Sequence, residues 1–124
     1  MANKVRFAVI GCGVISKFHA VSINEIENAE RVACFDAYKP GAEPFAKEYG
    51  VKMYETLEEM LAGPDIDAVC ICTPSGLHTP QAVQAMKAGK HIVCEKPMSL
   101  TLAEADELIN TAKETGVKVS IISQ

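Results

Sequence analysis

The sequence has no concentrated basic segment, no apolar run of membrane-spanning length and no pair of cysteines in a CxxC arrangement. Its 12 basic and 16 acidic residues give a net charge of −4, which argues against a nucleic-acid partner. The longest apolar stretch is interrupted by Gly11 and Gly13 and is far shorter than the ~20 residues of a membrane helix. The first residues, MANKVRF, lack the basic and apolar sections of a signal peptide, so we expect a cytoplasmic protein.

The five cysteines also lack the spacing of a zinc or redox motif. Cys12 lies in a glycine-rich turn, and the others lie in expected strands: Cys34, Cys70, Cys72 and Cys94. Small buried thiols pack like hydrophobic groups. We therefore predict structural roles for them, with Cys12 the candidate exception because it borders a possible ligand site.

What the sequence does contain is a regular alternation of strand and helix patterns, without a long linker or a repeat. The 124 residues are 48% apolar and 23% charged, as expected for one compact domain. The expected strands are Lys4–Ile10, Arg31–Asp36, Val51–Tyr54, Ala68–Cys72, His91–Cys94 and Lys118–Ser123. The expected helices are Val14–Ile26, Pro40–Tyr49, a short one capped by Thr56, one with Thr79-Pro80 as cap and first turn that runs to Ala88, and one from Thr101 to Gly116. Right-handed helical crossovers between such strands predict an α/β fold, a doubly wound parallel sheet (Rossmann fold) of order 3-2-1-4-5-6.

The segment VRFAVIGCGVIS, residues 5–16, predicts a strand, a tight turn and the start of a helix. Gly11 permits the turn, and Gly13 lets phosphates approach the backbone. Free N–H groups and the positive dipole end of the following helix favour an anion at this point. Asp36 follows the next apolar run about 20 residues later, where an acidic ribose ligand is expected.

Two further loops are expected at the same edge of the sheet, after strands four and five. They contain TPSGLH, residues 73–78, and EKP, residues 95–97. Together with GCGVISKFHA, these motifs resemble the Gfo/Idh/MocA family of sugar and cyclitol dehydrogenases, along the whole chain.

The resemblance implies an NAD(P)-dependent oxidoreductase, and it assigns roles to particular residues. The family's glycine-rich turn falls on Gly11, Cys12, Gly13, Val14 and Ile15, which would wrap the pyrophosphate. Asp36 would hold the adenosine ribose, and its charge favours NAD over NADP. The groove would be lined by Thr73, Pro74, Ser75 and His78, while Glu95 and Lys96 would lie beside the nicotinamide ribose and ring.

Lys96 is the expected catalytic residue, as a base or proton relay. A lysine is a poor base at its reference pKa of about 10.4, but desolvation and a cationic nicotinamide ring would lower that pKa, while Glu95 would oppose the shift. The substrate would be a sugar, nucleotide-sugar or cyclitol hydroxyl. The family's C-terminal substrate domain is absent from residues 1–124, so we expect this chain alone to bind cofactor without turnover, and the full-length enzyme to be a homo-oligomer.

Structural alternatives stand beside these assignments. Asp36 can be a solvated strand end, Lys96 a surface lysine before a proline, and His78 a packing or capping residue. His19 and His91 are expected to be structural. For the whole chain, the alternative to a dehydrogenase is a freestanding, non-catalytic module that senses the dinucleotide.

Overall fold

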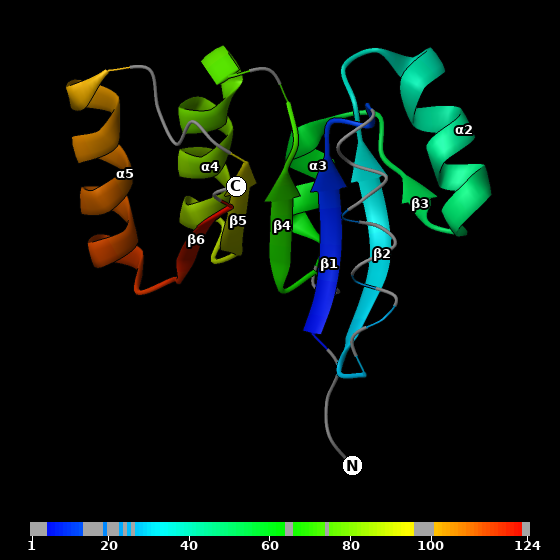
Figure 1. Ribbon diagram of the computed structural model, residues 1–124, viewed down its shortest axis with the longest axis horizontal. Coiled ribbons are helices and arrows are strands. Elements are labelled where there is room, and N and C mark those ends of the chain that lie inside the picture. The colour runs from blue at the N-terminus through cyan, green and yellow to red at the C-terminus, as the bar shows by residue number, and fades with distance from the viewer. Residues whose placement is uncertain are drawn as a thin grey trace.

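The computed structural model describes residues 5–13, 19, 23, 25, 27–63, 66–73, 75–95 and 101–122. Within these residues the strands are β1 (Val5–Ile10), β2 (Ala29–Phe35), β3 (Lys52–Met53), β4 (Ala68–Ile71), β5 (His91–Glu95) and β6 (Val119–Ile122). All the paired strands run parallel, in the order β3-β2-β1-β4-β5-β6 (Figure 1). The predicted fold class and strand order are confirmed.

Helices connect the strands along both faces of this sheet (Figure 1). They are α2 (Lys39–Tyr49), α3 (Leu57–Ala62), α4 (His78–Lys87) and α5 (Leu102–Thr115), with a 3₁₀ turn, η1 (Ser75–Leu77), before α4. The helix predicted for residues 14–26 lies largely outside the described residues, although His19, Ile23 and Glu25 have helical backbone. The observed boundaries otherwise differ from the predicted ones by one or two residues.

Two apolar cores form because successive strand residues point to opposite faces of the sheet. Ala8 and Ile10 of β1 pack with residues of α3 and α4, whereas Val9 packs with Ala42 and Phe45 of α2. All four residues of β4 are buried, as expected for a central strand covered on both faces. Because both faces are covered, a ligand can contact the sheet at the ends of the strands.

Predicted helix ends are confirmed at three places. Thr56 and Thr101 accept hydrogen bonds through Oγ1 from the backbone N–H groups of Glu59 and Glu104, at 3.2 and 3.1 Å. Gly50 ends α2 in the left-handed conformation, at φ +66°. These local signals act within a few residues, which is why the sequence predicts them well.

The start of α4 was predicted wrongly. The helix begins at His78, after an N-cap residue, Leu77, that makes no side-chain cap, so Thr79-Pro80 is not its cap and first turn. The Thr79 side chain is turned inward instead, with the residue only 2% exposed. With His78 and Thr79 buried, the helix begins two residues earlier than the Thr-Pro pattern indicates.

The carboxyl ends of four strands come together at one edge. Ile10 is in register with Phe35 on one side and with Ile71 on the other, and Ile71 is in register with Cys94. The chain order reverses between β1 and β4, and open α/β sheets bind ligands at such a point. The helices of the described residues are all too short or too polar to cross a membrane.

Candidate functional site

Gly11 begins the turn after β1 and packs directly against the loop after β4. Its φ is +90°, and its N–H donates to the Phe35 carbonyl at 2.7 Å. A Cβ atom at this position would lie 2.9 Å from Thr73 N, Thr73 Cγ2 and the carbonyl carbon of Cys72. Both the conformation and the contact therefore require glycine.

Gly13, two residues later, differs from Gly11 in having space for a side chain. No described residue has an atom within 4 Å of a Cβ added there, and the residue is exposed. Open space above a backbone position is what the approach of a phosphate group requires. Val14 and Ile15, the other predicted residues of this turn, lie outside the described residues.

Asp36 joins the turn after β1 to the start of α2. Its Oδ2 accepts a hydrogen bond from the Cys12 backbone N–H, and its Oδ1 accepts one from the Tyr38 N–H, both at 2.9 Å. The residue is half-buried. A carboxylate has about four lone-pair directions, so each oxygen can still accept a further hydrogen bond from a ligand hydroxyl.

Cys12 contributes its backbone to this arrangement, while its thiol is buried beneath. The residue is 7% exposed, and its Sγ donates weakly to the Phe35 carbonyl at 3.8 Å. The neighbouring Cys34 thiol, burial and the Asp36 charge raise the pKa of Cys12 above its ordinary value. The thiol is therefore protonated at neutral pH, and none of the five cysteines, all of which are among the described residues, forms a disulfide bond. Among the described residues, no group of three or more His, Cys, Asp or Glu can hold a metal ion.

The loop after β4 is held from two sides. The Thr73 hydroxyl donates to Gln81 Oε1 at 2.6 Å, and His78 Nε2 lies 2.7 Å from the Thr73 carbonyl oxygen, to which it donates. His78 is 2% exposed. Of its two interpretations, the geometry supports the structural one, in which the ring fixes the loop from inside. Pro74 lies outside the described residues, and Ser75 begins η1.

The loop after β5 is described only to its first residue. Glu95 ends β5 at the expected edge, in register with Ile122. Lys96 lies outside the described residues. The roles of Glu95 and Lys96 stay predictions.

Lys39 and His91 have partners outside the candidate site. Lys39 Nζ forms an exposed ion pair with Glu55 Oε1 at 3.4 Å. His91 begins β5 at the opposite edge of the sheet, where its Nδ1 accepts from the Lys118 N–H at 3.0 Å, in keeping with the structural role predicted for it. His19 is half-buried.

Sequence reasoning missed Gln81 and Tyr38. Gln81 orients Thr73 from the first part of α4, and a lone glutamine on a helix carries no signal for that role. Tyr38 was missed because its place beside Asp36 depends on the hydrogen bond from its backbone N–H to the Asp36 carboxylate.

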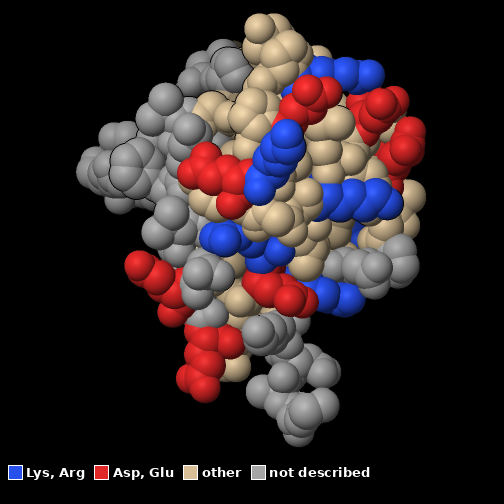
Figure 2. Space-filling model, turned by 90° about the vertical axis from the view of Figure 1, so that its right-hand side faces the viewer, with Lys and Arg blue, Asp and Glu red and all other residues tan. Residues whose placement is uncertain are grey.

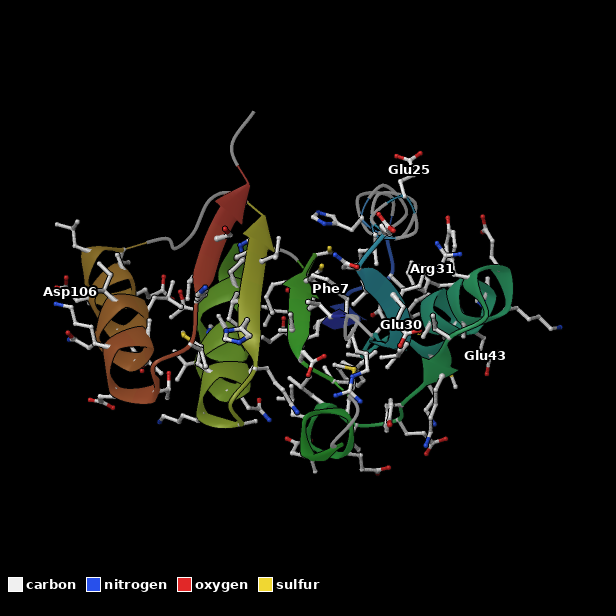
Figure 3. All side chains as sticks on the ribbon, turned by 90° about the horizontal axis from the view of Figure 1, so that it is seen from below. Phe7, Glu25, Glu30, Arg31, Glu43 and Asp106 are labelled. Atoms are coloured by element: carbon white, nitrogen blue, oxygen red, sulfur yellow. The ribbon has the colours of Figure 1, made fainter. Side chains whose placement is uncertain are left out.

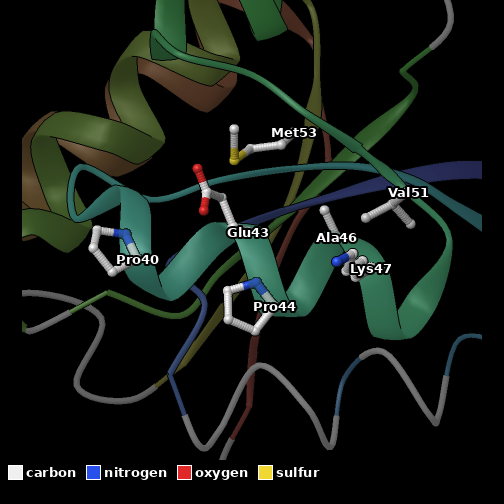
Figure 4. A pocket seen from close by; sticks show the side chains of 7 residues that line it. All are labelled: Pro40, Glu43, Pro44, Ala46, Lys47, Val51 and Met53. Carbon is white, nitrogen blue, oxygen red and sulfur yellow. The ribbon is translucent and has the colours of Figure 1, made fainter.

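A large surface hollow lies elsewhere, along α2 and β3 (Figure 4). It measures about 710 Å³ and is lined by Pro40, Glu43, Pro44, Ala46, Lys47, Val51 and Met53. None of the predicted site residues is among these. The face of the molecule that carries α2 shows basic and acidic side chains intermixed (Figure 2). In Figure 3, Glu43 lies on α2 and Arg31 on β2, where the Arg31 guanidinium packs over the Tyr49 ring, 4.9 Å from its centroid.

Comparison with known proteins agrees with this geometry. Residues 5–123 match the Gfo/Idh/MocA family model, described as an oxidoreductase family with an NAD-binding Rossmann fold. The chain is 38% identical to scyllo-inositol 2-dehydrogenase (NAD(+)) of Bacillus subtilis, covering 94% of this chain and 35% of that protein. It is 36% identical to inositol 2-dehydrogenase of Rhizobium meliloti, with the same two coverages.

A solved structure shows the same fold. The WlbA dehydrogenase from Bordetella pertussis, in complex with NADH and UDP-GlcNAcA, superposes with a TM-score of 0.93 at 34% identity, covering 97% of this chain and 37% of that one. The chain thus spans about a third of the length of the relatives it matches. By sequence match, strand order and the geometry of the turn after β1, the chain belongs to the Gfo/Idh/MocA oxidoreductase family, as an NAD-binding domain with the Rossmann fold.

Proposed function

We propose that this chain is the cofactor-binding part of a dehydrogenase that transfers a hydride between NAD and a hydroxyl group of a sugar, nucleotide sugar or cyclitol. The observation that carries the proposal is the Asp36 carboxylate, held by the Cys12 N–H beside Gly13, where an added Cβ would meet no described atom within 4 Å. NAD, when bound, supplies the hydride acceptor, and the protein supplies position and charge.

The described residues of the candidate site fit a bound dinucleotide. Gly13 leaves room for the pyrophosphate, and Asp36 has acceptors for both ribose hydroxyls. A negative carboxylate would repel a 2′-phosphate. Lys39, the nearby cation that could offset this repulsion, pairs with Glu55 instead. These contacts support NAD over NADP.

Lys96 is our candidate for moving the proton of the substrate hydroxyl. Lys96 is the next residue in the sequence after Glu95, and Glu95 ends β5 at the edge where Gly11, Asp36 and Thr73 gather. Oxidation of an alcohol needs a base near neutral pH, and a lysine in a desolvated cleft next to a cationic ring has its pKa lowered toward that range.

The substrate domain belongs to the same proposal. Catalysis needs the alcohol held about 3–3.5 Å from the reacting atom, and we assign that task to a further domain, as in relatives about three times as long. Their length favours an enzyme over the freestanding sensor. We also propose a cytoplasmic location and a homo-oligomeric full-length enzyme.

The proposal is tested in two steps. NADH fluorescence should report binding to residues 1–124, while a coupled assay with sugars, cyclitols and nucleotide sugars should show no turnover by this chain. A protein that joins this chain to its downstream reading frame should oxidise at least one member of that panel with NAD. Failure of the chain to bind NADH, or steady NADH production by the chain alone, would contradict the proposal.

A further inference from the structure

We propose that Tyr38 forms the stacking surface for the adenine base and thereby sets much of the affinity for the adenosine half of the dinucleotide. The inference rests on the proposed function, because it places the adenosine ribose at Asp36. Among the large hydrophobic side chains exposed in the described residues, Tyr38 is the one aromatic, with 68% of its surface accessible.

The backbone of Tyr38 is fixed on both sides. Its N–H donates to Asp36 Oδ1 at 2.9 Å, and its carbonyl accepts from the Gly41 N–H at 3.0 Å. It is the N-cap residue of α2, with extended φ and ψ of −93° and 97°. The ring is thus presented to solvent from a backbone that the Asp36 carboxylate itself anchors.

The ring and the carboxylate lie beside the same glycine. A Cβ atom added to Gly41 would be 3.4 Å from Tyr38 Cδ2 and 3.4 Å from Asp36 Oδ2. The absence of a side chain at Gly41 therefore leaves the ring edge and the carboxylate as neighbours. A hydroxyl group bound to Asp36 brings the rest of its nucleoside close to the ring of Tyr38.

The chemistry of adenosine then identifies the occupant. Its base is attached to the same ribose whose hydroxyls donate hydrogen bonds to Asp36. The base must therefore lie no farther from the carboxylate than the width of the sugar ring. A flat purine beside an accessible phenol ring gains stacking, and both groups lose water-exposed surface. An aromatic ring left in solvent beside a ligand site, rather than packed in a core, suits this use.

The test compares ligands that do and do not carry the base. In calorimetric titrations, Tyr38→Ala should weaken binding of ADP-ribose by roughly 5- to 30-fold, the lower part of the range for base–aromatic stacking, because the ring stays partly hydrated. Tyr38→Phe should retain the affinity. Nicotinamide mononucleotide, which lacks adenosine, should bind equally to all three proteins.

Ile109→Ala is the matched control, since Ile109 is also exposed, at 48%, but lies on α5, at the opposite end of the sheet from α2 (Figure 1). It should leave ADP-ribose binding unchanged. Unchanged binding of ADP-ribose by Tyr38→Ala would overturn the inference, as would an equal loss for nicotinamide mononucleotide. Failure of the unmodified chain to bind ADP-ribose would count against the proposed function itself.

Discussion

The backbone N–H of Cys12 and the carboxylate of Asp36 are joined by a 2.9 Å hydrogen bond across 24 positions of sequence. This bond ties the turn after β1 to the residue that follows β2. An ionised acceptor makes such a bond stronger than a neutral one, and it holds Asp36 in place before any ligand arrives. The same carboxylate therefore positions the turn and, in the proposed function, would accept hydrogen bonds from the ribose.

The first prediction concerns Asp36 and the choice of cofactor. The unmodified chain should bind NAD(H) more tightly than NADP(H), and Asp36→Ala should lower NAD(H) affinity by roughly 10- to 100-fold, because hydrogen bonds to a charged group contribute about 1.5–3 kcal/mol. The difference between the cofactors should also shrink. Calorimetric titration of both cofactors measures each effect.

Lys39→Ala serves as the control, since the Lys39 ammonium pairs with Glu55. It should leave the preference unchanged. Tighter binding of NADP(H) than NAD(H) by the unmodified chain would refute the role assigned to the Asp36 charge.

The second prediction separates the two glycines of the turn. Gly11→Ala should lower the free energy of unfolding by more than about 1 kcal/mol, because its φ of +90° and its contacts with Thr73 both exclude a Cβ. Gly13→Ala should change that free energy little, yet reduce NADH affinity. Urea unfolding and NADH titration of both variants provide the test. A strongly destabilised Gly13→Ala protein would show that the turn is not open as described.

The fold could be predicted from the sequence because its signals are local or periodic. Strands such as Ala68–Ile71 are short apolar runs, and Thr56 caps its helix through a residue three positions away. The start of α4 could not be predicted in this way, because burial of His78 against Thr73 overrides the Thr-Pro pattern. The burial of Lys90 could not be predicted either. Its Nζ donates to the carbonyl groups of Gly63 and Ile66, which lie more than 20 positions away in the sequence.

The candidate site, too, could be predicted only in part from the sequence. That Gly11 and Asp36 lie at one edge could be predicted, because each follows the end of a strand and the sheet brings those ends together. The contacts between them were beyond reach, because a hydrogen bond such as Cys12 to Asp36 depends on side-chain direction as well as topology. For the same reason the contact between the His78 ring and the Thr73 carbonyl could not be predicted.

A third prediction concerns stability at low pH. Arg6, through its side chain and its backbone N–H, lowers the pKa of Asp67 below its ordinary value; Arg6 Nε and Asp67 Oδ2 are 3.1 Å apart. A carboxyl group whose pKa is depressed by folding adds stability above its unfolded pKa and loses that stability as the pH falls through its folded pKa. Asp67→Asn should therefore be less stable than the unmodified protein at pH 6, and this deficit should shrink below about pH 4. Urea unfolding across this range is the measurement, and a deficit independent of pH would contradict it.

A fourth prediction concerns Lys96 in the full-length enzyme. If Lys96 moves the proton of the substrate hydroxyl, Lys96→Met should reduce kcat by roughly 10²- to 10⁴-fold, the usual contribution of acid–base catalysis. NADH affinity should change much less. Lys113→Met, at an exposed position near the end of α5, is the matched control and should leave kcat unchanged. Full turnover by Lys96→Met would reduce Lys96 to a scaffold residue.

The last prediction concerns Thr79, whose Oγ1 is buried without a hydrogen-bond partner among the described residues. Burying an unpaired hydroxyl costs free energy, and valine has nearly the same shape, so Thr79→Val should raise the free energy of unfolding by roughly 0.5–1.5 kcal/mol. Thr111→Val is the matched control, because the buried Thr111 hydroxyl donates to the Glu107 carbonyl at 2.7 Å. That variant should gain no stability. Urea unfolding of the two variants side by side decides the matter, and a loss of stability in Thr79→Val would mean that the hydroxyl has a partner in the folded protein.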